Sequence, residues 1–239
     1  MAWPRLTTCT AILSAAVIVG TGPAAARAAA TAPPDGSYSF AVSRGGMRVG
    51  TAAVTVRRAA PSVTVHEVET FTGVTETADE SLDMDELLPT SYVSSFPVTS
   101  DIGVTARITF DSQGARETVD GVTGSTDFRL ESGTSRIVVI DGAMATGFFF
   151  LPAQVKAQDL TAFTLLSPSL ADTYYCTVNG TATPPRPPGL PGADVSLTID
   201  GSSPSSTTEF DIWYDPQTLT ADEIDVPSQE TSITRVRTP

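Results

Sequence analysis

Few side chains in this sequence have the type and spacing that catalysis requires. His66 is the single histidine, so any Ser/His/Asp or Cys/His mechanism has to use it. It lies in a strand-like run, and no G-x-S-x-G nucleophile elbow accompanies it. There is also no Gly-rich phosphate loop, zinc-ligand spacing or haem motif. The sequence therefore predicts a protein that is not an enzyme, with no catalytic residues, no metal site and no cofactor.

Cys176 is the one cysteine that remains after the predicted signal cleavage described below. It lies in an apolar strand run, where a lone thiol is typical of a small buried hydrophobe. The nearest basic residue in sequence is Arg186, so little positive charge is at hand to activate the thiol. The alternative interpretation is an intermolecular disulfide, because odd cysteines in exported proteins sometimes pair between chains.

Carboxylates are the most concentrated chemical groups, and they allow two interpretations. They could provide the six to eight oxygen ligands of Ca²⁺, although their spacing does not match an EF-hand loop. They could also form a solvated acidic edge that prevents sheets from pairing edge to edge, which is the preferred interpretation. The first cluster comprises Glu76, Asp79, Glu80, Asp83, Asp85 and Glu86, and a second comprises Asp222, Glu223 and Asp225.

Dispersed carboxylates also keep a hydrolase as an alternative, since the two groups of a glycosidase need only meet in space. Carbohydrate sites usually present several aromatic platforms. The chain beyond the predicted signal has one tryptophan, Trp213, in a strand end that favours a core or rim role. The hydrolase interpretation therefore ranks below a binding protein.

Alternation of apolar and polar residues predicts the strands that must position these groups. The first hairpin is expected at residues 38–56, turning at Gly45-Gly46, because two-residue hairpin turns need positive φ. In the next strand Val63 and Val65 share one face, and Val68 falls on the other parity. This change predicts a β-bulge near His66.

Later elements follow the same pattern. The apolar run at 136–140 is expected to be buried on both faces. Asn179-Gly180 predicts a hairpin, and residues 184–192 a Pro-rich surface loop. Residues 230–237 are expected to add an edge strand.

One segment, residues 143–155, has helical character, and Pro152 is expected to shorten or kink it. It is interpreted either as a plug that fills the concave side of a curved sheet or as a movable lid over an apolar cavity. The plug is preferred, because three adjacent phenylalanines cannot all leave water by one helix face. The predicted ligand-binding residues come from this segment: Met144, Phe148, Phe149, Phe150 and Leu151.

The first thirty residues have the features of a secretory signal peptide: Arg5, an apolar stretch at 10–22 and A-x-A cleavage sites at 24–30. The formal net charge of −13 becomes about −15 once Arg5 and Arg27 are removed. Such a charge repels phosphate backbones, so no nucleic-acid partner is expected. No mature segment is long enough for a transmembrane helix.

Six short stretches carry a resemblance to a known group: YSFAV (38–42), GGMRVGT (45–51), LPTSY (88–92), a helix at 146–154, FDIWYDP (210–216) and residues 219–226. Together they resemble a group of bacterial exported domains of unknown function that are similar to the LolA/LolB half-barrel. The resemblance implies a curved sheet with a covering helix and an apolar concavity, and it carries over no catalytic residue. Lipoprotein carriers among these relatives bind acyl chains there, whereas the Pro-rich loop and the acidic balance depart from them.

The sequence thus predicts a mostly β fold, a single curved antiparallel sheet whose concave face is covered by a short helix. Residues 1–30 are assigned to the signal peptide and 31–239 to one domain with a Pro-rich loop at 184–192. The expected function is an exported, periplasmic or secreted, non-enzymatic protein that binds an apolar small molecule or lipid or serves in envelope maintenance. The alternatives are an acidic, Ca²⁺-binding structural or adhesive surface module, and then a hydrolase. The oligomeric state is left open.

Overall fold

The structure is a computed structural model that describes residues 33–97, 103–121, 123–130, 133–134, 136–141, 146–168, 172–179, 195–203 and 206–237. The predicted signal peptide, the Pro-rich loop at 184–192 and Met144 lie outside these residues.

Strands dominate the described part of the chain. The N-terminal strands are β1 (Gly36–Arg44), β2 (Met47–Ala59), β3 (Ser62–Phe71), β4 (Val74–Asp83), β5 (Pro89–Pro97), β6 (Gly103–Asp111), β7 (Gly114–Val119) and β8 (Thr126–Arg129). The later strands are β9 (Ile137–Val139), β10 (Ala162–Ser167), β11 (Asp172–Asn179), β12 (Val195–Ser202), β13 (Thr207–Tyr214), β14 (Ala221–Val226) and β15 (Thr231–Val236). The helices are α1 (Thr146–Gln158) and the 3₁₀ turn η2 (Pro227–Gln229).

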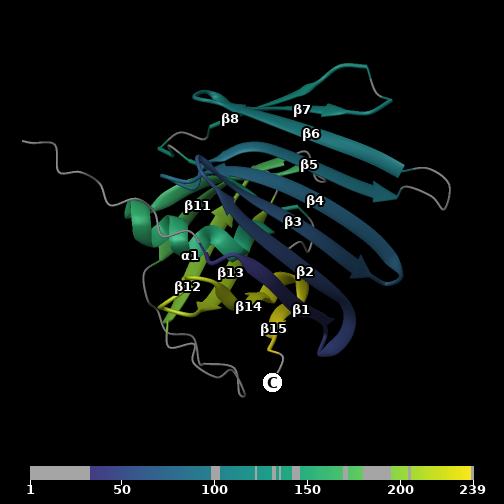
Figure 1. Cartoon of the computed structure of the whole chain (residues 1–239), viewed down its shortest axis with the longest axis vertical. Coiled ribbons are helices and arrows are strands. Elements are labelled where there is room, and N and C mark those ends of the chain that lie inside the picture. The colour runs from purple at the N-terminus through teal and green to yellow at the C-terminus, as the bar shows by residue number, and fades with distance from the viewer. Residues whose placement is uncertain are drawn as a thin grey trace, which may run out of the picture.

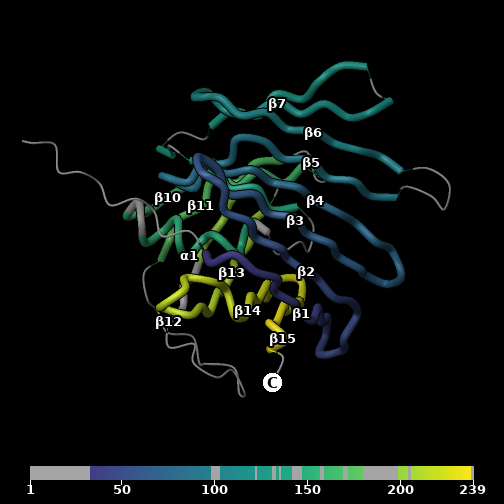
Figure 2. The backbone as a smooth tube through the Cα atoms, in the orientation of Figure 1, coloured from purple at the N-terminus to yellow at the C-terminus, as the bar shows by residue number. Residues whose placement is uncertain are grey.

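Among the described residues, fifteen strands form one sheet in the order β8-β7-β6-β5-β4-β3-β2-β1-β15-β14-β13-β12-β11-β10-β9. Every pairing is antiparallel except that of β9 with β10. The sheet is bent so that its N-terminal strands form one wall and the strands from β10 onward form the other (Figure 1, Figure 2). The predicted fold class, a single curved sheet with one short α-helix, is confirmed.

The first hairpin forms as the sequence predicts. Gly45 and Gly46 connect β1 to β2 with φ of 56° and 75°. These left-handed angles suit the right-handed twist of the strands, and glycine adopts them without a steric cost. Inward residues of both strands, such as Phe40 and Val54, are fully buried.

The last strand lies in the middle of the sheet, so the prediction of an edge strand at 230–237 is wrong. β15 pairs with β14 on one side and with β1 on the other. Phe40, for example, lies opposite Arg235. β15 therefore joins the N-terminal and C-terminal halves, a pairing between residues far apart in the sequence that local pattern does not reveal.

Asn179 ends β11, and the next described strand, β12, begins at Val195. The two strands are antiparallel neighbours, with Asn179 opposite Thr198. The residues that connect them, including Gly180 of the expected Asn-Gly turn, lie outside the described part of the chain.

Helix α1 lies inside the curve of the sheet and contacts β3, β9 and β14 (Figure 1). Residues 147–154 are all buried, as expected for a helix that is apolar on every side. The helix starts three residues later than predicted and continues beyond Pro152 to Gln158. Close packing against β9 depends on Gly147, where a Cβ atom would lie 1.9 Å from the carbonyl oxygen of Val139. β9 is buried on both faces, as predicted.

Within the described residues, no helix has both the length and the apolar character needed to cross a bilayer.

Candidate functional site

A pocket of about 470 Å³ opens between the two walls of the sheet. Apolar side chains from β3, β10 and β13, together with Ile140, supply part of its lining: Phe71, Leu165, Phe210 and Ile140. The volume lies in the range of roughly 300 to 1,000 Å³ that is typical of small-molecule sites. The pocket therefore has the size and part of the apolar surface that an apolar ligand requires.

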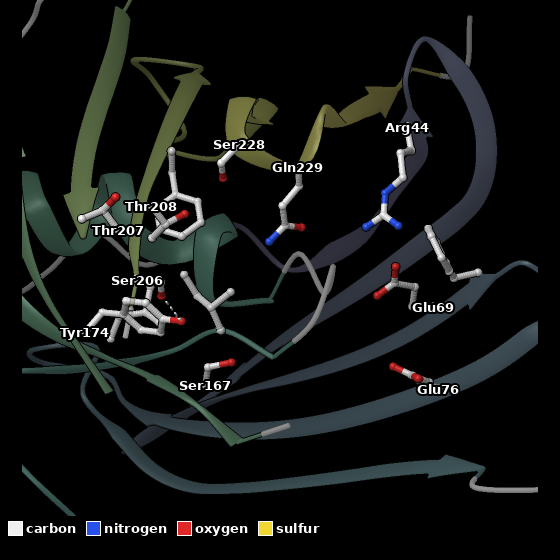
Figure 3. A pocket seen from close by; sticks show the side chains of 14 residues that line it. Arg44, Glu69, Glu76, Ser167, Tyr174, Ser206, Thr207, Thr208, Ser228 and Gln229 are labelled. Atoms are coloured by element: carbon white, nitrogen blue, oxygen red, sulfur yellow. Dashed lines mark hydrogen bonds between the residues drawn. The ribbon is translucent and has the colours of Figure 1, made fainter. Parts of the chain in front are cut away.

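Polar groups gather around this apolar surface. Figure 3 shows Arg44, Glu69 and Glu76 on one side of the pocket and Ser167, Tyr174 and Ser206 on the other. The Ser206 hydroxyl donates a hydrogen bond of 3.2 Å to the Tyr174 oxygen. A few polar groups that converge on an apolar surface are the usual means by which a pocket orients its ligand.

The most unusual of these groups is Glu69 on β3. Its side chain is 2% exposed, and neither carboxylate oxygen has a hydrogen-bond partner among the described residues. Glu76 of β4 lies directly opposite in the strand register. Burial, and then the charge of Glu76, raise the pKa of Glu69 from 4.5 to about 7. The pKa of Glu76 is also raised, by burial and then by Asp141.

Arg44 of β1 supplies the positive charge in this pocket, and it is held by other groups. Its Nε donates to the Thr231 hydroxyl at 3.4 Å, and its guanidinium carbon lies 5.5 Å from the centroid of the Phe71 ring. The second geometry is that of a cation–π contact. Although Arg44 faces the same space as Glu69 in Figure 3, it does not hydrogen-bond the Glu69 carboxylate.

Glu69 is not among the predicted site residues, because the sequence pattern indicated a β-bulge near His66. That prediction is wrong, since β3 has no bulge there. β3 keeps an unbroken register with both β2 and β4. The inward parity set by Val63 and Val65 simply continues through Glu67 and Glu69, both of which are buried. Strict period 2, followed without regard to polarity, was the signal that could have found them.

A second group of buried ionisable side chains lies on the neighbouring strands β4 and β5. Glu80 of β4 is 4% exposed and opposite Tyr92 of β5, and burial raises the Glu80 pKa from 4.5 to about 8. Burial, then Asp141, Glu67 and Glu80 in that order, raise the pKa of Tyr92 well above 10. Carboxylic acids with raised pKa values therefore extend from the pocket into the interior.

The predicted solvated edge at residues 76–86 is wrong, because β4 is an internal strand and alternation divides the cluster between two faces. Glu80 points inward, whereas Asp79 is exposed and its Oδ1 lies 2.8 Å from Nδ1 of His66. His66 is thus half of an exposed cross-strand pair on the outer face. Among the described residues, no group of three or more His, Cys, Asp or Glu side chains is arranged to hold a metal ion.

Asp83 organises the turn between β4 and β5. Its Oδ1 accepts from the backbone N–H of Glu86 at 2.6 Å, and its Oδ2 accepts from that of Leu88 at 2.9 Å. Glu86 then forms an ion pair with Arg136 at 3.0 Å, which connects this turn to the segment before β9. These carboxylates have structural roles.

The second acidic run is also not a solvated edge. Asp222 is 2% exposed and forms ion pairs with Arg235 at 3.3 Å and Arg237 at 2.7 Å. Glu223 is buried on β14, and burial and then Asp225 raise its pKa to about 7.

Cys176 is fully buried on β11, and burial raises its pKa to about 12. Its sulfur would lie 3.1 Å from a Cβ atom at Gly201, so the thiol packs closely against β12. This position supports its interpretation as a small buried hydrophobe, because a disulfide with a second chain requires an accessible sulfur.

The structure places four of the predicted ligand-binding residues in the core, and the fifth, Met144, lies outside the described residues. Phe148, Phe149, Phe150 and Leu151 are at most 1% exposed, and they do not line the pocket described above. The Phe148 ring lies 4.8 Å from the Phe210 ring, centroid to centroid. Phe148 thus packs against Phe210 of the pocket wall, and the ligand-binding role of the segment stays a prediction.

Comparison with known proteins found no matching family model, no matching curated protein and no matching solved structure.

Proposed function

We propose that this chain is an exported, non-enzymatic binding protein that holds a small apolar molecule in the pocket between the two walls of its sheet. The observation that carries the proposal is the pocket itself, with apolar side chains from both walls and polar groups around them. Burying apolar surface provides the driving force for binding, at about 25 cal/mol for each Å² removed from water. The resemblance to the LolA/LolB half-barrel group supports a lipid-like ligand.

A stable core around the pocket favours binding without large rearrangement. The Phe149 ring lies 4.7 Å from Tyr38 and 5.3 Å from Phe150, centroid to centroid. This aromatic packing connects α1 to β1 and keeps the helix inside the curve. A pocket backed by a close-packed core is largely formed before its ligand arrives, which reduces the ordering cost of binding.

Native mass spectrometry of the protein purified from its own host tests the proposal most directly. A co-purifying apolar molecule is the expected result. With the recombinant protein, the dye N-phenylnaphthylamine is expected to bind and to gain fluorescence. Failure of the dye and of an alkyl ligand series to bind would contradict the proposal.

Two matched variants locate the binding site. Ser228 is exposed and lines the pocket, so Ser228→Trp is expected to obstruct its mouth and weaken dye binding at least tenfold. Thr118 is exposed on β7, away from the pocket, and Thr118→Trp is expected to bind as the wild type does. Equal binding by both variants would place the dye elsewhere.

A hydrolase is the second candidate, and the pair Glu69 and Glu76 favours it. Two opposed carboxyl groups in a pocket, one with a pKa near 7, are suited to general acid–base chemistry. Turnover of a fluorogenic ester or glycoside that disappears in Glu69→Gln would support this candidate. Saturable dye binding without turnover would leave the binding protein as the better proposal.

A further inference from the structure

The carboxyl pair in the pocket has a consequence for the ligand's chemistry. We propose that the ligand carries a protonated amine beside its apolar part, and that Glu69 and Glu76 bind that amine. The inference rests on the proposed function, because it assigns a polar group to the molecule that the same pocket holds.

The unpartnered state of Glu69 is the first argument. A buried carboxyl group without a hydrogen bond is destabilising, and proteins rarely leave one in that state. Both oxygens of Glu69 are in that state, on a side chain that lines the pocket. An ammonium group has three donors and no acceptor, so it can satisfy a carboxylate that the protein leaves unsatisfied.

The geometry of the strands is the second argument. Glu69 and Glu76 are a directly opposed cross-strand pair, and such pairs place their Cβ atoms about 4.5 to 5.5 Å apart. Like charges at this spacing repel one another, so the pair is destabilising unless a proton or a cation lies between them. An ammonium group would bridge the two carboxylates and remove that repulsion.

The charged groups around Glu69 agree with this assignment. β2 presents Ala52 opposite Glu69, which contributes no charge. On β4, the negative charge of Asp141 raises the pKa of Glu76, so Asp141 adds further negative potential at this pair. Arg44 of β1 is the one charge of opposite sign facing the pocket among its described lining residues, and it lies over Phe71 and donates to Thr231.

Beside Glu69 and Glu76, the pocket also has an apolar surface that can hold the apolar part of the ligand. Leu165, Ile140 and Phe210 are buried residues in its lining, whereas Glu69 and Glu76 lie on the side of β3 and β4 (Figure 3). A molecule with a hydrocarbon part and an amine at one end would place each end against a surface of matching chemistry. The excess of acidic residues in the chain as a whole would also attract a cationic ligand.

A matched ligand series tests the inference. Octylamine, octanol and octanoate share a chain and differ in the terminal group, and each can compete with N-phenylnaphthylamine at pH 8. Octylamine is expected to bind at least tenfold more tightly than octanol, and octanoate to bind most weakly. Equal binding of octylamine and octanol, or tightest binding of octanoate, would overturn the amine assignment while leaving the apolar pocket intact. If neither the dye nor any of the three ligands binds, the proposed function itself fails.

Variants then assign the effect to residues. Glu69→Gln keeps the shape and removes the charge, so octylamine is expected to lose at least tenfold in affinity while octanol is unchanged. Glu76→Gln should cause a smaller loss. Glu209→Gln, an exposed site on β13, is the control and should bind all three ligands as the wild type does. Unchanged octylamine binding by Glu69→Gln would overturn the inference.

Arg44→Gln provides an independent test of the amine assignment. If an amine is the ligand, removal of the competing guanidinium should strengthen octylamine binding and leave octanol unchanged. Octylamine binding should also tighten as the pH rises from 6 to 8, because Glu69, with a pKa of about 7, loses its proton in this range. Weaker octylamine binding by Arg44→Gln would overturn the proposal.

Discussion

The buried carboxyl group of Glu80 makes the stability of this protein depend on pH in an unusual direction. A carboxylic acid with a raised pKa in the folded state keeps its proton there, whereas the unfolded chain releases it above about pH 4.5. The contribution of this group to stability is therefore complete below about pH 4.5, falls as the pH rises, and is lost once the pH passes about 8. Glu69 acts in the same direction up to about pH 7.

The magnitude follows from the two pKa values. The folded value of about 8 and the ordinary value of 4.5 differ by about 3.5, and each pKa unit corresponds to about 1.4 kcal/mol. The free energy of unfolding is thus expected to fall by roughly 5 kcal/mol over this range through Glu80 alone. Since small domains have total stabilities of about 5 to 15 kcal/mol, the effect is large enough to measure.

Glu80→Gln isolates the contribution, because the amide has nearly the same shape and does not ionise. Urea unfolding, followed by circular dichroism between pH 5 and pH 9, gives the free energy of unfolding at each pH. The variant is expected to resemble the wild type within about 1 kcal/mol at pH 5 and to exceed it by several kcal/mol at pH 9.

Glu209→Gln, at an exposed position, is the control and should follow the wild-type curve at every pH. If Glu80→Gln also follows the wild-type curve, the carboxyl group of Glu80 is not buried in the way described.

Further predictions concern the core. Phe149→Ala should lower the free energy of unfolding by about 3 to 5 kcal/mol in urea titrations, because the ring is fully buried; an unchanged midpoint with lost ligand uptake would favour a movable lid. Gly147→Ala should destabilise by about 1 to 3 kcal/mol, since its Cβ atom would collide with the Val139 carbonyl; a neutral effect in the same titration would mean that α1 can shift. Cys176 should react with Ellman's reagent only after denaturation, and rapid reaction of the native protein would contradict its burial.

The burial of the inward carboxyl groups on β3 was not predicted from the sequence. The alternation along β3 is visible in the sequence. The prediction assigned inward positions only as far as Val65, because the next residues of that parity are not apolar. Glu67 and Glu69 continue that side. Sequence pattern assigns glutamate to solvent, because burial of a carboxyl group is costly and is accepted only where the fold forces it or function requires it.

The predicted ligand-binding segment shows the same limit in the opposite direction. The run at Phe148–Phe150 was recognised as apolar and as a cover for the sheet, and these residues are indeed buried. The pocket wall, however, is formed by side chains such as Phe71 and Phe210, from strands that are distant in the sequence. Composition identifies a residue that avoids water but does not identify its neighbours.

Local sequence pattern predicts the strand periodicity, the Gly45-Gly46 turn, the doubly buried strand β9 and the low helix content. These depend on backbone conformations and side-chain alternation within a few residues of each other. In contrast, the pairing of β15 with β1 and the position of Glu69 on a pocket wall opposite β10 and β13 depend on the complete fold. Pairing between strands that are distant in the sequence arises from tertiary contacts, so no local pattern specifies it.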